Sequence, residues 1–141
     1  MCGIVGFLAH RKVIKLLMSG LRTLEYRGYD SAGVALLHQN QFQLIRAVGK
    51  LVNLQKLIDE SAPAQCGIGH TRWATHGGAT EANAHPHVVG RVAVVHNGIF
   101  ENYADIRRQL TAQGAVFKSE TDTEVLSQLV SKIYESGASR E

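Results

Sequence analysis

Apolar side chains recur along the chain with two periods, and each period predicts a different kind of element. A short apolar run at 3–9, bounded by glycine, is typical of a buried strand and places Cys2 at its very start. Two strand patterns on either side of Gln39 and Asn40 predict a hairpin with a short turn. The segments with a strand pattern are 3–9, 34–38, 41–47, 67–72, 91–96 and 115–118.

Helical spacing of apolar residues covers much of the remaining chain. The last helix is preceded by Thr121 with Glu124 three residues later, which together predict a capping box. Strands and helices follow one another in an irregular order and include a hairpin, so the pattern predicts an α+β domain rather than a doubly wound parallel fold. The segments with a helical pattern are 12–25, 51–58, 103–114 and 125–133.

Two polar stretches interrupt these patterns. The stretch 71–87 is too poor in aliphatic residues to belong to a core, and a long ordered loop of this kind is usually functional. The shorter stretch 26–33 has two glycines with Asp30 and Ser31 between them, which also predicts a loop. We therefore expect the chemistry of the protein to be carried by loops.

Composition narrows the class of protein. Of the 141 residues, 45% are apolar and 19% are charged, which is typical of a globular domain rather than a disordered chain. The formal net charge is only +3 and the basic residues are scattered, so we expect no nucleic-acid partner. No apolar run is long enough to span a bilayer, so no membrane partner is expected. The two cysteines, Cys2 and Cys66, do not make a disulfide framework, which favours a cytoplasmic location.

The position of Cys2 suggests a specific chemistry. Removal of Met1 would leave Cys2 with a thiol and a free α-amino group on the same residue. An α-amino group has a reference pKa of about 7.7–8.0 and a thiol one of about 8.5, so the amine can accept the thiol proton near neutral pH. This is the arrangement in which an N-terminal amine activates a nucleophile.

Several motifs together give the chain a family resemblance. They are MCGIVG at the start, LEYRGYDSAG at 24–33, HTRWATHG at 70–77, NAHPH at 83–87, VVHNGIFEN at 94–102 and SETDTEV at 119–125. With these motifs in this order, the chain resembles the N-terminal glutaminase domain of the glucosamine-6-phosphate synthase family, which are class II glutamine amidotransferases with an N-terminal nucleophile. The resemblance covers essentially the whole sequence.

The resemblance implies a role for particular residues. The position of Cys2 matches the nucleophile, and those of Asn97 and Gly98 match the donors that stabilise the tetrahedral oxyanion. Arg72 matches the residue that binds the carboxylate of glutamine, and Asp122 matches the partner of its ammonium group. Further matches are pocket walls at Trp73, Thr75, His76 and Gly77, with Trp73 on a loop that closes over substrate, and supporting positions at Arg27 and His85.

Each of these residues also has a plainer interpretation. An Asn-Gly pair after a strand is often a simple turn, which would account for Asn97 and Gly98. Asp122 would favour the helix dipole from the first turn of its helix. Arg72 alone is compatible with a surface ion pair, and a lone tryptophan such as Trp73 is often a core residue.

The resemblance also implies a fold and a larger protein. The fold is an N-terminal-nucleophile α/β/β/α sandwich of antiparallel sheets, of which residues 1–141 would be an incomplete glutaminase domain, truncated at its C-terminal side. The sugar-isomerase domains that bind fructose 6-phosphate and make glucosamine 6-phosphate would be absent. L-Glutamine is the implied substrate, no cofactor is implied, and full-length members of the family are expected to be homo-oligomers.

Two other functions stay open from the residues alone. Five histidines are crowded into 27 positions, and His85 and His87 would share one face of an extended segment, so a metal-dependent hydrolase is conceivable. None of the usual metal-ligand spacings is present, however, and we expect no metal. The third possibility is an inactive fragment that acts only as a binding module. The five histidines are His70, His76, His85, His87 and His96.

Overall fold

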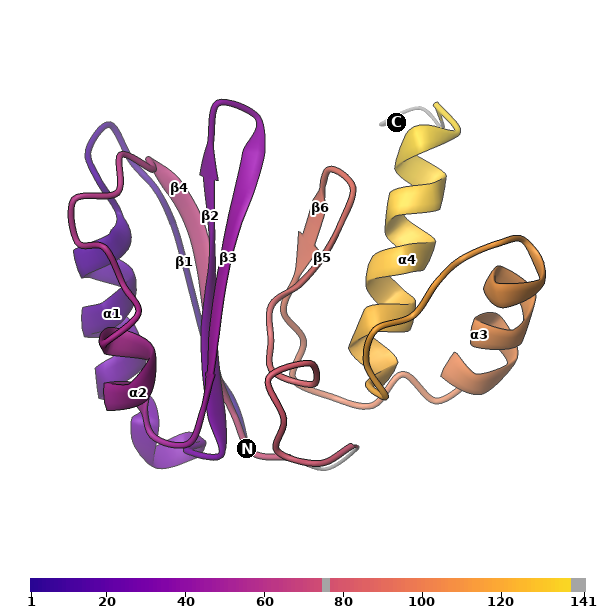
Figure 1. The fold of residues 1–141 in the computed structure, drawn as a ribbon, viewed down its shortest axis with the longest axis horizontal. Coiled ribbons are helices and arrows are strands. Elements are labelled where there is room, and N and C mark those ends of the chain that lie inside the picture. Colours follow the sequence, from indigo (N-terminus) through magenta and orange to yellow (C-terminus); the bar gives the residue numbers. More distant parts are fainter. Residues whose placement is uncertain (75–76, 138–141) are drawn as a thin grey trace.

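The computed structural model describes residues 1–74 and 77–137, which form four layers (Figure 1). Two helices lie on the outer face of a four-stranded sheet, and a two-stranded sheet lies on its other side. A long helix covers the far face of the smaller sheet. This arrangement confirms the predicted sandwich of antiparallel sheets between helices.

The larger sheet is antiparallel throughout and has the order β1-β4-β2-β3. Its hairpin turns at Gln39 and Asn40, which both have positive φ, as a two-residue turn between twisted strands requires. Strand β4 lies in the interior of the sheet, so it holds the residues that follow it in a fixed place. The strands are β1 (Gly3–Leu8), β2 (Ser31–His38), β3 (Gln41–Val48) and β4 (Cys66–Arg72).

The apolar core lies between this sheet and the helices α1 (Ile14–Thr23) and α2 (Leu51–Gln55). Gly67 and Gly69 on β4 face α1, and a Cβ at Gly69 would lie 2.9 Å from the side chain of Leu21. The missing side chains therefore allow the helix to pack closely on the sheet. The buried core includes Val13, Ile14, Leu17, Leu21, Val34, Leu36, Leu51 and Leu54.

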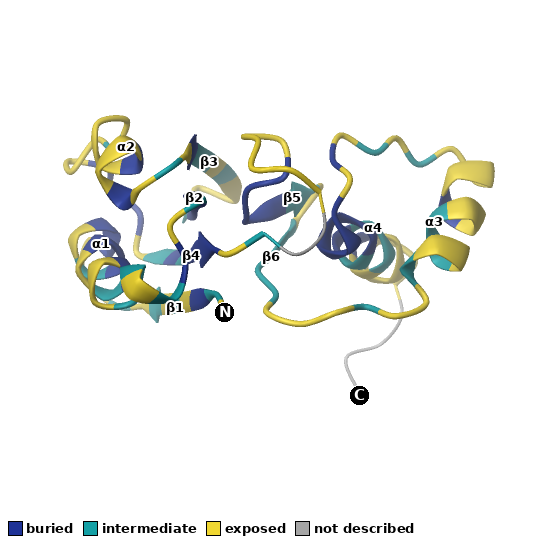
Figure 2. Cartoon of the chain, turned by 90° about the horizontal axis from the view of Figure 1, so that it is seen from below, coloured by how far each residue is buried: buried dark blue, intermediate teal, exposed yellow. Residues whose placement is uncertain are grey.

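The second half of the chain builds the other two layers. Strands β5 (His87–Val89) and β6 (Val92–Val94) pair antiparallel, α4 (Asp122–Glu135) packs on them, and α3 (Tyr103–Ala112) packs on α4. Figure 2 shows buried residues concentrated where these layers face one another. No helix among the described residues is long and apolar enough to cross a bilayer.

The predicted capping box of the last helix is only half formed. The Thr121 hydroxyl accepts the N–H of Glu124 at 3.3 Å, as predicted. The carboxylate of Glu124 does not return to the N–H of Thr121; it accepts the N–H groups of Ser119 at 2.6 Å and Lys118 at 2.8 Å. Glu124 therefore ties the preceding loop to the helix.

Four other predictions about elements need correction. Segment 115–118 is not a strand: its backbone bonds to helices instead, with the carbonyl of Val116 accepting from the Gln128 side chain at 3.0 Å. The strand predicted at 91–96 is limited to β6, because its partner β5 is equally short. The helix predicted at 51–58 ends at Gln55, and the predicted loop 26–33 contains a 3-10 turn, Glu25–Arg27, and the first residues of β2.

Candidate active site

The start of the chain lies beside the end of β4 and opens into a pocket of about 130 Å³. The pocket lies where the two layers of strands meet the first turn of α4. It brings together residues from both ends of the sequence. Its lining consists of Met1, Cys2, Arg72, Trp73, His85, His96, Asn97, Gly98, Ile99, Thr121, Asp122 and Thr123.

The sulfur of Cys2 lies against the backbone of Trp73. The N–H of Trp73 donates to Sγ at 3.5 Å, and Sγ lies 3.9 Å from the carbonyl oxygen of the same residue. The antiparallel pairing of β1 with β4 produces this contact, because Gly3 is opposite Thr71 in the register. Cys2 is half-buried and is not in a disulfide, so its sulfur is available to the pocket.

Arg72 is the last residue of β4 and is only 4% exposed, yet its side chain reaches the pocket. Its guanidinium donates to the carbonyls of Gly78 at 3.1 Å and Gly77 at 3.4 Å. Both acceptors are backbone carbonyls of the loop that follows the strand. A buried cation with this orientation suits an anionic ligand group such as a carboxylate.

Asp122 provides the opposite charge across the pocket. It is 6% exposed, and its Oδ2 accepts the backbone N–H of Phe100 at 2.7 Å. This bond links the first turn of α4 to the turn that contains Asn97 and Gly98. The pocket therefore has a basic residue from β4 and an acidic residue from α4 in its lining, as the two charged groups of a free amino acid require.

Asn97 and Gly98 form an exposed turn after β6 at the pocket wall. A Cβ on Gly98 would lie 2.9 Å from Nε2 of His96, so a side chain at this position would displace the histidine. Asn97 carries a side-chain amide and Gly98 a backbone N–H, and both residues line the pocket. Two such donors can stabilise an oxyanion.

Three histidines are packed between the layers next to the pocket, and one of them, His85, lines it. The rings of His70 and His85 stack at a centroid distance of 4.4 Å, and His87 meets His85 edge-on at 4.8 Å. Burial lowers the pKa of both His70 and His87 to about 4, and it also lowers the pKa of His85. These imidazoles are therefore neutral at physiological pH.

The structure places most of the predicted site residues around this one pocket. Cys2, Arg72, Trp73, His85, Asn97, Gly98 and Asp122 all line it. Gly77 is outside the lining and accepts a bond from Arg72, while Arg27 contacts Sδ of Met1 at 3.7 Å. Thr75 and His76 lie outside the described residues.

Sequence reasoning missed part of the lining. The missed lining residues are His96, Ile99, Thr121 and Thr123. Each lies within two positions of a predicted site residue, and this proximity in the sequence could have indicated them. Cys66, like Cys2, is half-buried and is not in a disulfide. Within residues 1–74 and 77–137, no group of three or more histidine, cysteine or acidic side chains could hold a metal ion.

A cysteine at position 2, in a pocket beside two antiparallel sheets enclosed by helices, is the arrangement of the class of N-terminal-nucleophile amidotransferases. Comparisons with known proteins agree. The sequence model of the family described as a glutamine amidotransferase domain matches residues 55–140. The chain belongs to this glutamine amidotransferase family, which confirms the resemblance read from its motifs.

The curated relatives of the chain indicate a narrower group within this family. The chain is 54% identical to the glutamine-fructose-6-phosphate aminotransferase (isomerizing) of Brucella suis biovar 1, over 99% of this chain and 23% of that protein. It is 56% identical to the protein of the same name from Acinetobacter baylyi, over 92% of this chain and 21% of that protein. The chain thus spans less than a quarter of the length of these relatives.

Solved structures give the same fold. One neighbour is a glutamine phosphoribosylpyrophosphate amidotransferase from B. subtilis complexed with ADP and GMP, with a TM-score of 0.78 and 27% identity over 93% of this chain and 29% of that one. Another is described as the allosteric regulatory enzyme of purine biosynthesis, with a TM-score of 0.80 and 29% identity over 93% of this chain and 30% of that one.

Proposed function

We propose that this chain, once Met1 is removed, hydrolyses the side-chain amide of L-glutamine through a glutamyl thioester on Cys2. The observation that carries the proposal is the single pocket that joins Cys2, Arg72, Asp122 and the Asn97–Gly98 turn. The charged groups fit the two ends of a free amino acid. The cysteine and the turn fit the chemistry of its amide.

Binding orients the substrate. The Arg72 guanidinium pairs with the α-carboxylate of glutamine, and the Asp122 carboxylate pairs with its α-ammonium group. The bond from the N–H of Phe100 keeps the Asp122 carboxylate in place. Holding both ends directs the side-chain amide toward the sulfur and removes much of the entropic cost of the reaction.

The reaction then proceeds in two halves. The α-amine of processed Cys2 takes the thiol proton, and the thiolate attacks the amide carbon to form a tetrahedral oxyanion. Asn97 and the Gly98 N–H stabilise this oxyanion, a contribution of about 3–4 kcal/mol per donor in comparable sites. The C–N bond breaks, the nitrogen takes the proton from the α-ammonium and leaves as ammonia. Water, deprotonated by the same amine, then hydrolyses the thioester to release glutamate.

In a protein of the length of its relatives, the ammonia would serve glucosamine 6-phosphate synthesis from fructose 6-phosphate. The sugar would bind outside residues 1–141, in sugar-isomerase domains, and the whole protein would act as a homo-oligomer in the cytoplasm. The names of the Brucella and Acinetobacter relatives support the use of glutamine and fructose 6-phosphate; the oligomer and the location follow from the family resemblance alone.

We also infer that residues 1–141 are one part of the glutaminase domain. A two-stranded sheet is marginally stable by itself, and β5 with β6 forms such a sheet here. The apolar side chain of Ile99, which follows β6 in the chain, is exposed. Additional strands beside β6 would cover such surfaces.

The proposal is tested by an intact-mass measurement and a glutaminase assay on the same sample. We expect a mass lower by one methionine and equimolar release of ammonia and glutamate from glutamine. A processed, folded chain that binds glutamine without hydrolysing it would overturn the catalytic proposal. It would favour the alternative of an inactive fragment that acts only as a binding module.

A further inference from the structure

The loop between the 3-10 turn and β2, residues 28–30, packs against the peptide backbone at the end of β4. Its residues belong to the motif YRGYDSAG, whose glycines and Asp30 have no role in the proposed reaction. All three loop residues contact the segment Arg72–Ala74. This is the same segment that lies against the sulfur of Cys2.

Asp30 makes the polar part of this contact. Its backbone N–H donates to the carbonyl of Arg72 at 3.2 Å, and its Oδ2 accepts the N–H of Ala74. Its other carboxylate oxygen accepts the hydroxyl of Ser31 at 3.0 Å, which fixes the rotamer of the side chain. Asp30 thus bonds to the peptide group before Trp73 and to the peptide group after it, and together these bonds restrain the orientation of the Trp73 N–H.

Gly28 and Tyr29 make the remaining contacts of this loop with the backbone and side chain of Trp73. A Cβ on Gly28 would lie 2.7 Å from the carbonyl oxygen of Arg72 and 2.9 Å from the nitrogen of Trp73, so the loop backbone packs directly on this peptide. The ring of Tyr29 meets the Trp73 ring edge-on at a centroid distance of 5.3 Å. Backbone, carboxylate and ring thus all act on one residue, Trp73.

We propose that Asp30 is a positioning residue, which holds the Trp73 N–H toward the sulfur of Cys2 and thereby stabilises the thiolate. The N–H of Trp73 donates to Sγ at 3.5 Å, and hydrogen bonds to a charged acceptor are stronger than those to a neutral one. The bond that the Ala74 N–H donates to the Asp30 carboxylate restrains the neighbouring peptide and so keeps the Trp73 N–H from turning away. The catalytic consequence rests on the proposed function, because only a nucleophilic Cys2 benefits from a stabilised thiolate.

The test measures the rate of iodoacetamide alkylation at Cys2 against pH, resolved by peptide mass spectrometry. Asp30→Ala removes the side-chain acceptor of the Ala74 N–H and leaves only the backbone bond to the Arg72 carbonyl, so the Trp73 peptide is less restrained and the pH midpoint at Cys2 should rise by about one unit. Asp30→Asn keeps an acceptor oxygen for the Ala74 N–H but lacks the charge, so its midpoint should stay near that of the unchanged chain. Cys66 in the same samples is a reference thiol and should not move.

The two variants separate positioning from charge. If Asp30 acted on Cys2 only through its negative charge, both substitutions would favour the thiolate and lower the midpoint, which would overturn the proposal. A midpoint that is the same in all three proteins would also overturn it. If Asp30→Ala does not fold, a lowered midpoint in Asp30→Asn still contradicts positioning and an unchanged one supports it.

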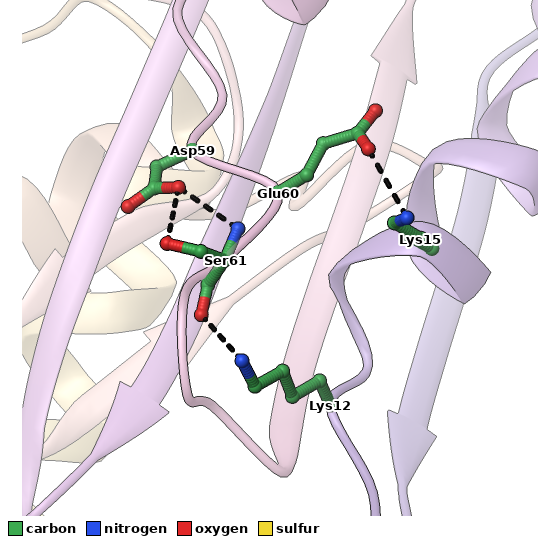
Figure 3. A network of polar contacts seen from close by, with 5 residues as sticks. All are labelled: Lys12, Lys15, Asp59, Glu60 and Ser61. Atoms are coloured by element: carbon green, nitrogen blue, oxygen red, sulfur yellow. Dashed lines mark hydrogen bonds and ion pairs between the residues drawn. The ribbon is translucent and has the colours of Figure 1, made fainter.

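A matched control uses another aspartate that accepts a backbone N–H. Asp59 accepts the N–H of Ser61 at 2.8 Å and its hydroxyl at 2.7 Å, in an exposed turn whose Ser61 carbonyl accepts a bond from Lys12, just before α1 (Figure 3). Asp59→Ala should leave the Cys2 midpoint unchanged. A shift equal to that of Asp30→Ala would show a general effect and overturn the proposal.

This experiment is independent of glutamine. A predicted shift in a chain that releases no ammonia would support the positioning role and refute the proposed function. Ammonia release without the predicted shift would support the proposed function and refute the positioning role of Asp30. In an active chain, Asp30→Ala should lower kcat more than it changes KM for glutamine, since Asp30 does not line the pocket.

Discussion

Single polar side chains at the pocket connect segments that lie far apart in the sequence. Thr121 is an example: its hydroxyl accepts the N–H of Glu124 and also lies 2.8 Å from Nε2 of His87, 34 positions away. Asp122 beside it accepts the N–H of Phe100. The start of α4 is therefore fixed to both neighbouring segments, which determines where the Asp122 carboxylate lies in the pocket.

The cap of α4 gives a prediction at this scale. Thr121→Ala removes the acceptor for the Glu124 N–H and the partner of His87, so we expect a loss of about 1–2 kcal/mol in the free energy of unfolding. Denaturant titration of both proteins measures this difference in the free energy of unfolding. Asn102 is a matched control, because it precedes α3 but its side chain makes no capping bond. If Asn102→Ala cost as much as Thr121→Ala, the hydroxyl contacts would not be the cause.

The sequence identified the residues with chemistry but few of their contacts. Cys2, Arg72, Asn97, Gly98 and Asp122 were predicted together and line one pocket, while their catalytic roles stay predictions. The bond between the Trp73 N–H and Cys2 joins positions 71 apart and depends on the register of β1 and β4. No local pattern contains that register. The role of Asp30 could not be predicted for the same reason.

At the scale of elements, predictions succeeded where the cause is local. The β2–β3 hairpin follows from its two-residue turn, and α1 follows from its apolar spacing. Segment 115–118 has a strand composition but no strand partner in the described chain, and its backbone bonds to the neighbouring helices. A strand needs a neighbour, which composition cannot supply.

At the scale of the whole molecule, the two faces of the larger sheet differ in kind. The face toward α1 packs aliphatic side chains, whereas the face toward the smaller sheet packs histidines and Arg46, which donates to the carbonyls of Ala82 and Ala84. The apolar interface is insensitive to pH. The interface of histidines is not, because its imidazoles are buried in the neutral form.

This interface predicts acid lability. The folded pKa of His70 and His87 is about 4, below the unfolded value of about 6.5, so the unfolded chain binds more protons between these limits. The free energy of unfolding should therefore fall as pH drops from about 6.5 to about 4, by up to about 1.4 kcal/mol per pH unit for each histidine. The depressed pKa of His85 adds to the loss in the same direction.

Urea unfolding at a series of pH values measures this dependence. His70→Gln should remove about one proton from the uptake that accompanies unfolding, whereas His10→Gln, at an exposed position, is the control. A free energy of unfolding that stays constant between pH 6.5 and 4 would contradict the neutral histidine interface.

The central claim is that the sulfur of Cys2 attacks glutamine. The most direct measurement compares ammonia release from glutamine by the processed chain, by Cys2→Ala and by Cys66→Ala. Both substitutions remove one half-buried, unpaired thiol, and only Cys2 lines the pocket. We predict that Cys2→Ala abolishes ammonia release while Cys66→Ala retains it. Ammonia release by folded Cys2→Ala at the rate of the unsubstituted chain would contradict the account.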